Sequence, residues 1–308
     1  GRGRNADFLQ YMRAAYLNGD YRDWDKWNFG SYKYYTPDHY VIGYIINTAV
    51  RQISENYFYP SDLLRYEVKH FYNPSVLFRA FNSVAGKSRQ HFLEEGQNIL
   101  TEIWTKELES IGEPTTGERV TSKDEKLYTD YRYPVYVSDT TSRYYGHIIA
   151  VKEGFEQNRS LISVDSAGKE KILRPFSGYT SPLALGKDGK IYWSESIFNG
   201  ATQLKDYSVI ASFDLKTGKI KIKRYNTRYY NPAPSPTGDM IAVAEYPVEG
   251  SSNLIVLSSD KQEVLRKIEA PNKGQIKEIA FIGDTIYCSV ILDKGLGIYS
   301  YDRVKWRE

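Results

Sequence analysis

The second half of the chain repeats one pattern, and this repeat constrains the possible folds more than any other feature. The segments Ser181–Ser196 and Asn231–Tyr246 both contain a short apolar run, a turn with a glycine and a second apolar run, and Glu278–Val290 is a weaker copy. The glycines of successive turns are 49 and then 45 positions apart: Gly189, Gly238 and Gly283. A period in the forties with strand–turn–strand content is typical of β-propeller blades. The repeat therefore predicts about four blades.

A second recurrence marks the turns between the outer strands of the predicted blades. The turn at Asp165–Gly168 has counterparts within Phe213–Ile222 and Val256–Leu265. Aspartate and glycine recur there because they adopt the backbone conformations of the tight turns that join antiparallel strands. Together the two recurrences predict blades at Tyr133–Ser177, Gly178–Asn226, Thr227–Pro271 and Asn272–Trp306.

The first part of the chain instead has apolar residues at helical spacing. Its clearest predicted helix has Thr36 as the N-cap and Pro37 at the first position, where the missing N–H costs nothing. The apolar stripe of that helix is continuous: Ile42, Ile45, Ile46, Ala49, Val50 and Ile53. Four more helices are predicted, from Asn5 to Gly19, after Ser61, from Asn73 to Gly86 and from Ser88 to Glu109.

A polar segment without periodicity, Ser110–Asp130, separates the two patterns. We place the domain boundary inside it, because the linkers between domains are commonly polar and contain glycine and proline. The sequence thus predicts a multidomain α and β protein. Its α-helical module covers residues 1–115, and its propeller blades cover residues 125–308.

Composition argues against several classes of function. The 308 residues carry 41 basic and 38 acidic side chains, a formal net charge of +3, so no nucleic-acid partner is expected. No apolar run approaches the roughly 20 residues that span a bilayer, so no membrane span is expected. Cys288 is the only cysteine, which excludes an intrachain disulfide. Because residue 1 is glycine and no signal peptide is recognisable, we expect a piece of a longer protein.

The residues that could carry catalysis do not form a recognisable set. No two of the four histidines stand four residues apart: His39, His70, His91 and His147. His91 and Glu94 could share a helix face as metal ligands do, but a surface pair is the preferred interpretation because no second pair is nearby. Cys288 lies in an apolar strand pattern, which favours a buried structural thiol. We therefore predict no catalytic residue, no metal site and no cofactor within this chain.

A weaker signal points to ligand binding. In a propeller the innermost strand of each blade begins near the central channel, and the loops at one end form a shared mouth. The positions before the first strand of each repeat carry aromatic, hydroxyl, amide and amine groups: Tyr179, Thr180, Tyr230, Asn231, Gln275 and Lys277. These side chains either hold a polar ligand by stacking and hydrogen bonds or only fill the channel, and the second interpretation is preferred.

The second half resembles a known repeat. The segment Ser235–Val243, with the sequence SPTGDMIAV, resembles the repeat of TolB-like propellers, in which a Ser-Pro-x-Gly turn precedes an apolar strand. Leu185–Trp193 keeps the Asp-Gly pair but lacks the second Ser-Pro, and the copy at Glu278–Val290 is weaker. The resemblance implies repeats of the six-bladed-propeller type. Because fewer blades are counted here, we expect either an irregular ring of about four or five blades or an open arc that self-associates through its free edges.

The helical part resembles a more specific group. The segments Gly1–Tyr21, Gly30–Gln52 and Asn73–Trp104 look like the region downstream of the active site in gluzincin-type, peptidase-MA-like metallopeptidases of Bacteroidetes. Those proteins are often secreted or periplasmic and carry a TolB-like propeller after the peptidase-like part. The resemblance therefore implies a periplasmic or extracellular location. The zinc motif of that group, H-E-x-x-H, would lie before residue 1, so zinc is implied only in an upstream segment.

Three functions follow from these patterns. The leading one is a non-catalytic propeller that binds a ligand or a protein, with the helical module as an accessory, in an exported peptidase-like protein. The first alternative is part of an active zinc metallopeptidase whose H-E-x-x-H segment precedes this chain. The second alternative is a scaffold that serves protein–protein contacts alone. The expected partners are a protein, a peptide or a glycan, with self-association through open propeller edges.

Overall fold

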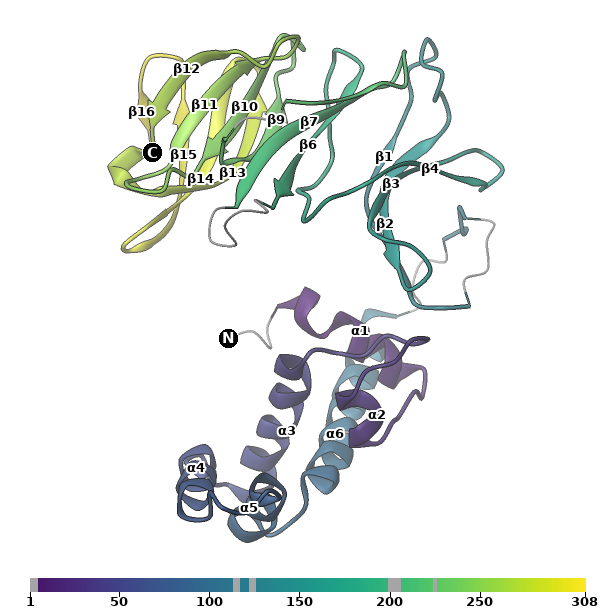
Figure 1. Ribbon diagram of the computed structural model, residues 1–308, viewed down its shortest axis with the longest axis vertical. Helices are drawn as coiled ribbons and strands as arrows, with labels where there is room; N and C mark the ends of the chain where they lie inside the picture. The colour runs from purple at the N-terminus through teal and green to yellow at the C-terminus, as the bar shows by residue number, and fades with distance from the viewer. Residues whose placement is uncertain (1–4, 113–116, 122–125, 199–205, 224–225) are drawn as a thin grey trace. The chain divides into compact units, whose positions relative to one another are not determined.

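The computed structural model describes residues 5–112, 117–121, 126–198, 206–223 and 226–308. The chain divides into two compact units, a helical unit of Gly1–Glu118 with Lys126–Tyr128, and a β unit of Arg119–Glu125 with Thr129–Glu308. Figure 1 shows the labelled helices in the first unit and the labelled strands in the second. The predicted order, a helical part followed by sheets, is confirmed. That the two parts are separately folding domains stays a prediction.

Six α-helices are described in the helical unit. They are α1 (Ala6–Leu17), α2 (Trp24–Asn28), α3 (His39–Ser54), α4 (Tyr59–Lys69), α5 (Val76–Ala85) and α6 (Arg89–Ile111). Three of them begin after a residue whose side chain accepts a hydrogen bond from a backbone N–H of the first turn: Asn5, Asp38 and Ser88. These N-caps satisfy N–H groups that have no partner within the helix.

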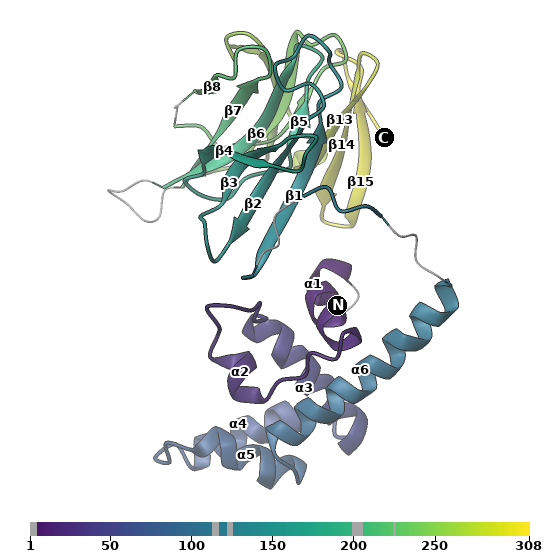
Figure 2. The ribbon, with the colours of Figure 1, turned by 90° about the vertical axis from the view of Figure 1, so that its right-hand side faces the viewer.

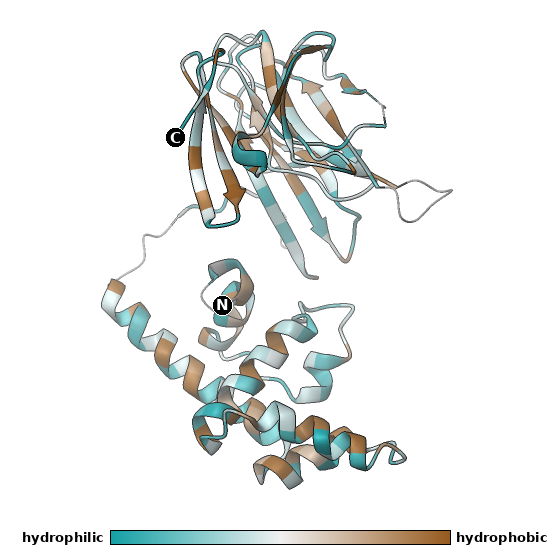
Figure 3. Cartoon of the chain, turned by 90° about the vertical axis from the view of Figure 1, so that its left-hand side faces the viewer, coloured by the Kyte–Doolittle hydropathy of each residue, from teal (hydrophilic) through white to brown (hydrophobic). Residues whose placement is uncertain are grey.

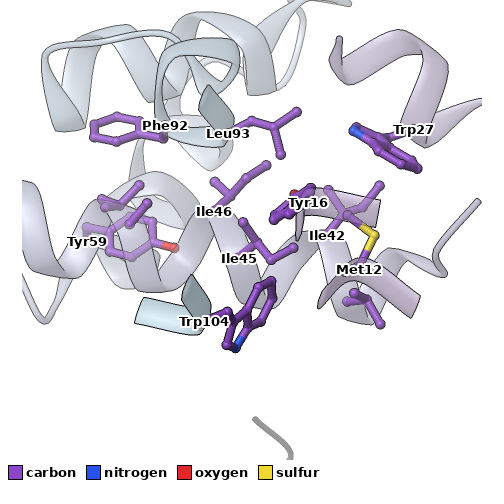
Figure 4. Packing of buried hydrophobic residues seen from close by; sticks show 13 residues of the cluster. Met12, Tyr16, Trp27, Ile42, Ile45, Ile46, Tyr59, Phe92, Leu93 and Trp104 are labelled. Atoms are coloured by element: carbon purple, nitrogen blue, oxygen red, sulfur yellow. The ribbon is translucent and has the colours of Figure 1, made fainter. Parts of the chain in front are cut away.

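The core of the helical unit forms where α1, α3 and α6 meet. Figure 4 shows Met12 and Tyr16 of α1, Ile45 and Ile46 of α3, and Trp104 of α6 in one cluster. All five side chains are buried, because each helix turns its apolar stripe toward the others. Burying one large apolar side chain contributes roughly 1.5–3 kcal/mol, so this cluster is a main source of stability in the helical unit.

Some predicted helix boundaries are wrong. The helix predicted to begin after Thr36 has Asp38 as its N-cap, because the Asp38 carboxylate accepts a hydrogen bond from the Val41 N–H at 2.9 Å. The helix predicted after Ser61 begins earlier, with Pro60 in its first turn. The short helix α2 was not predicted, because one helical turn and a half is too little sequence to show a period.

The apolar stripes of α4 and α5 are partly exposed. Leu64 and Val68 lie in α4, but Phe71, predicted to share their face, follows the end of the helix, and all three side chains are exposed. Leu77, predicted to face inward, is also exposed, whereas Ala80 of the same helix is fully buried. Spacing along a helix thus identifies the stripe, but not whether another element covers it.

Among the described residues, the β unit contains four sheets, each of four antiparallel strands in chain order (Figure 2). The first comprises β1 (Thr129–Tyr136), β2 (Ile148–Gly154), β3 (Ser160–Val164) and β4 (Glu170–Pro175). The second comprises β5 (Ala184–Leu185), β6 (Lys190–Ile197), β7 (Tyr207–Asp214) and β8 (Ile220–Ile222). The third comprises β9 (Tyr229–Pro234), β10 (Met240–Glu245), β11 (Asn253–Ser258) and β12 (Val264–Glu269). The fourth comprises β13 (Gln275–Ile282), β14 (Thr285–Leu292), β15 (Gly295–Tyr301) and β16 (Trp306–Arg307).

Successive sheets pack against one another. Three clusters of buried side chains join them in chain order, with Leu161 and Trp193 in the first cluster, Ile210 and Val243 in the second, and Val256 and Ile286 in the third. No buried cluster among the described residues joins the first sheet to the fourth. The prediction of about four blades is confirmed, because the described residues form four propeller-like sheets. The described residues of the β unit do not close these sheets into a ring.

The position of each strand determines its burial. Strands β6 and β11 are buried along most of their length, because apolar side chains on both of their faces contact neighbouring sheets. The outermost strand β12 is largely exposed. Figure 3 shows hydrophobic and hydrophilic residues interspersed along both the strands and the helices. None of the helices within the described residues has the length and apolar composition that crossing a membrane requires.

Candidate functional site

The innermost strands of the second, third and fourth sheets form a groove. It has a volume of about 340 Å³ and is lined by residues 181–184, 231–232 and 277–279. These segments lie in or just before β5, β9 and β13, and β9 packs against both of the other strands. Figure 1 shows β9 and β13 close together in the β unit. The repeat thus brings equivalent parts of three sheets to one place.

Two of these strands carry a β-bulge at the groove. In β9 the register shifts so that Asn231 and Pro232 lie opposite the single residue Val243. In β13 a similar shift leaves Lys277 without a residue opposite. Asn231 has a φ of 52°, in the left-handed region that asparagine tolerates better than most residues. A bulge redirects a side chain from the regular alternation of the strand and is common beside binding sites.

The same irregularity occurs in the first two sheets. In β1 the register shifts so that Tyr133, with a φ of 55°, and Pro134 lie opposite Ala150. In the second sheet, Thr180 pairs with Glu195 as an isolated bridge, and regular pairing resumes only at β5. All four sheets therefore interrupt their innermost strand at an equivalent point, which makes the interruption a property of the repeat.

The polar groups of the groove include donors and acceptors. The Asn231 Nδ2 donates a hydrogen bond to the Lys277 backbone carbonyl at 2.6 Å, which joins β9 to β13. The Ser181 Oγ accepts a hydrogen bond from the Ser194 N–H at 2.9 Å. The Lys277 ammonium lies 3.7 Å from the Glu278 carboxylate, and both side chains are largely exposed. Such an exposed ion pair contributes little to stability, so both charges can reorient toward a ligand.

The structure places only some of the six predicted residues in the groove. Asn231 and Lys277 line it. Tyr230, the neighbour of Asn231, packs against Tyr246 with the ring centroids 4.9 Å apart. Gln275 begins β13 and is exposed, but it is not among the residues that line the groove.

The remaining two predicted residues lie before β5. Tyr179 is exposed, and the Arg159 guanidinium carbon lies 5.4 Å from the centre of its ring. The Thr180 hydroxyl is buried and has no hydrogen-bond partner among the described residues. Neither residue lines the groove. That the six residues bind a ligand stays a prediction.

The prediction from sequence missed the apolar part of the groove. This part consists of residues that follow the predicted positions: Pro182, Leu183, Ala184, Pro232 and Ile279. One available signal is an X-Pro pair that recurs where three innermost strands are interrupted: Tyr133-Pro134, Ser181-Pro182 and Asn231-Pro232. Proline cannot donate a hydrogen bond to a neighbouring strand, so within sheets it occurs at edges and bulges. This recurrence would have located the interruptions.

The other chemically reactive residues have structural surroundings. Among the described residues, no group of three or more His, Cys, Asp or Glu side chains is placed to hold a metal ion. The His147 Nδ1 forms a hydrogen bond with the Ser163 Oγ at 2.7 Å. Cys288 is buried between the third and fourth sheets, and this burial raises the pKa of its thiol to about 12. A buried thiol of this kind is unreactive in the folded state.

Comparison with known proteins gives structural likenesses only. No family model matches the chain, and no curated protein matches it. A prolyl endopeptidase structure is 12% identical with a TM-score of 0.44, over 60% of this chain and 29% of that one. The β-propeller domain of the Trilobed protease from Pyrococcus furiosus is 14% identical with a TM-score of 0.41, over 58% of this chain and 55% of that one.

A third structure is a protein assigned to TolB from Agrobacterium tumefaciens. It is 13% identical with a TM-score of 0.41, over 54% of this chain and 61% of that one. The present chain thus spans less than two thirds of the length of each of these three proteins.

Proposed function

We propose that the β unit binds an extended peptide segment in the groove between β5, β9 and β13, and that it does so without catalysis. The observation that carries this proposal is that the interruptions of three innermost strands meet at one groove. The groove volume of about 340 Å³ lies within the roughly 300–1,000 Å³ of pockets that hold small ligands. It therefore has room for a few residues of a peptide.

The chemistry of the groove favours a peptide over a purely charged ligand. A peptide backbone presents N–H donors and C=O acceptors in alternation. The groove offers an amide at Asn231, a hydroxyl at Ser181, an ammonium at Lys277 and a carboxylate at Glu278. Because both charges are present, a ligand of one charge would meet repulsion as well as attraction. The prolines and Ile279 provide apolar surface for a peptide side chain.

The wider assignment is also a proposal and rests on sequence resemblance. We assign the β unit to the TolB-like propellers and the helical unit to the gluzincin-type peptidase-like proteins of Bacteroidetes, in a periplasmic or extracellular location. In such a protein, zinc would belong to a segment upstream of this chain. The peptide-binding proposal differs from the peptidase alternative because it requires no bond cleavage.

The proposal is tested with a peptide selected from a random heptapeptide phage library on the immobilised protein. The selected peptide is labelled, and its affinity is measured by fluorescence anisotropy. The Asn231→Gly variant removes the amide but keeps the left-handed backbone, which glycine adopts without strain. We expect it to weaken binding about tenfold, as for the loss of one or two hydrogen bonds.

The Asn272→Gly variant is a matched control. Asn272 has a φ of 51°, and its Nδ2 donates a hydrogen bond to the Tyr299 hydroxyl at 3.3 Å, but it does not line the groove. We expect this variant to bind the peptide as the unmodified protein does. If both variants bind equally well, or if the protein cleaves the peptide, the proposal is wrong.

A further inference from the structure

A second cavity lies between the third and fourth sheets. It has a volume of about 240 Å³ and shares no lining residue with the groove. Its apolar wall contains one side chain from each of six strands, β10 to β15: Met240, Val256, Leu265, Phe281, Ile286 and Tyr301. Val256, Ile286 and Tyr301 are buried, whereas Leu265 is exposed, so the apolar wall extends from the interior of the sheets to the solvent.

Two arginines complete the lining of this cavity. Arg303 forms an ion pair with Asp284 at 3.1 Å. Arg266 donates a hydrogen bond from Nη1 to the Arg303 backbone carbonyl at 2.8 Å, and no carboxylate in the described parts of the chain lies within ion-pair distance of it. A guanidinium has five N–H donors. The Arg266 side chain is exposed at the edge of this cavity, and most of its donors have no protein partner among the described residues.

We propose that this cavity binds the apolar body of a small carboxylate, and that Arg266 binds the carboxylate group. The planar guanidinium pairs with a carboxylate through two parallel hydrogen bonds, whereas it repels a cationic ligand. The apolar wall excludes a strongly polar body, because its polar groups would lose their hydrogen bonds to water. The proposal concerns a site separate from the peptide groove and stands independently of it.

The cavity size limits the ligand. A volume of about 240 Å³ is below the roughly 300–1,000 Å³ of sites for drug-sized molecules. The ligand is therefore no larger than a short acyl chain or one apolar amino-acid residue. Two sources share this chemistry, a free medium-chain fatty acid and the C-terminal residue of a peptide.

The test compares acids with their neutral amides on the full chain. Octanoate and octanamide represent the fatty acid, and N-acetyl-leucine and N-acetyl-leucinamide represent the C-terminal residue. Dissociation constants are obtained by nuclear magnetic resonance titration. We expect the preferred acid to bind about tenfold more tightly than its own amide, because only the acid gains the charge-assisted pair. The tighter of the two acids identifies the source.

Variants at two neighbouring positions separate the effect of the Arg266 charge from an effect on the fold. Arg266→Gln is expected to abolish the preference for the acid while leaving amide binding unchanged, which also shows that the cavity is intact. Lys267→Gln is the matched control, because Lys267 is the neighbouring cation and pairs with Glu245 at 2.7 Å. It should keep the preference. Equal binding of acid and amide, an unchanged preference in Arg266→Gln, or no binding at millimolar concentration would overturn the proposal.

Discussion

The helical unit and the β unit differ in the charged groups that they bury. Both units bury neutral polar atoms without a hydrogen-bond partner among the described residues, such as the Trp27 Nε1 in the helical unit and the Thr180 hydroxyl in the β unit. In the β unit, Glu195 is 1% exposed, and Arg174 donates to both of its carboxylate oxygens at 2.6 and 2.8 Å. Lys152 is likewise buried and pairs with a glutamate at 2.5 Å.

This difference indicates what each unit depends on. A buried neutral group without a partner costs about 1–3 kcal/mol, whereas an isolated buried charge costs far more. Both units can therefore hold a few unpaired neutral polar atoms. The β unit can hold its buried charges only when they are paired. Loss of a buried charge should therefore harm the β unit most.

The largest effect is expected from Glu195→Gln. The change removes the charge that pairs with Arg174 and weakens the acceptor of the Ser177 N–H, which lies at 3.0 Å. We expect it to lower the free energy of unfolding of the β unit by about 3 kcal/mol, because the loss of one partner leaves the other charge poorly solvated. Urea unfolding is monitored by the hydrogen exchange of backbone amides in β6 and in α3. The two sets of amides report the stability of the β unit and of the helical unit separately.

The control for this change is an exposed ion pair in the same unit. Lys267→Gln removes the partner of Glu245, and the Lys267 side chain is 57% exposed. Because exposed pairs contribute little, we expect a loss below about 1 kcal/mol. If the two variants lose equal stability, or if Glu195→Gln destabilises α3 instead, the contrast between the two units is wrong.

Smaller effects on stability are expected from two glycines in the helical unit. Their alanine variants should change the free energy of unfolding in opposite directions. A Cβ added at Gly96 in α6 would lie 2.9 Å from the Ile45 Cγ2 and 3.3 Å from the Ile45 carbonyl oxygen. At Gly43 in α3 its nearest neighbour would be the Asn47 Nδ2 at 3.9 Å. We expect Gly96→Ala to lower the free energy of unfolding by about 1–2 kcal/mol through overpacking. Gly43→Ala should raise it by about 0.5–1 kcal/mol through helix propensity.

Thermal unfolding of the two alanine variants tests this pair. The same substitution in neighbouring helices should shift the melting temperature in opposite directions. A gain in stability for Gly96→Ala would mean that α3 and α6 are less tightly packed than the structure shows.

Acid should weaken the β unit through Glu195. Burial raises the pKa of this carboxyl, but the hydrogen bonds from Arg174 and Ser177 outweigh burial and hold the pKa below its ordinary value. The ionised form therefore stabilises the fold above the unfolded pKa of about 4.3, and this contribution is lost as the pH falls through the folded pKa. Urea midpoints of the native protein and Glu195→Gln should differ at neutral pH and converge in acid. Parallel pH profiles would contradict this role.

The smallest expected effect is at Cys288. Because burial raises the pKa of its thiol to about 12, the nucleophilic thiolate is scarce in the folded protein. We expect negligible reaction with Ellman's reagent until the β unit unfolds, and one thiol per chain in urea. Rapid labelling under native conditions would show that the interface between the third and fourth sheets opens readily.

Much of the fold could be predicted because its signals are local and repeated. The turns at Gly189 and Gly238 recur with the blade period, and the predicted four blades correspond to four sheets. N-caps such as Asn5 and Ser88 are also readable, because capping depends on neighbouring residues. The exposure of Leu64 could not be predicted, since it depends on whether a distant segment covers α4.

The candidate site could be predicted only in part. Asn231 and Lys277 were found because the repeat places the start of each innermost strand near its neighbours. Tyr179 was predicted beside them, yet it lies outside the groove, because Ser181-Pro182 and not Tyr179-Thr180 is the counterpart of Asn231-Pro232. A shift of one residue in a strand moves a side chain to the other face. Register at a bulge is a property of two strands, and one strand's sequence does not determine it.

Hydrogen exchange of the full chain with and without the phage-selected peptide tests the central claim most directly. The groove comprises three segments that are far apart in sequence, residues 181–184, 231–232 and 277–279. We predict that the peptide slows exchange in all three at once, and that Asn231→Gly reduces this protection at equal peptide concentration. Protection confined to a single sheet, or to the helical unit, would contradict the claim that the innermost strands form one binding site.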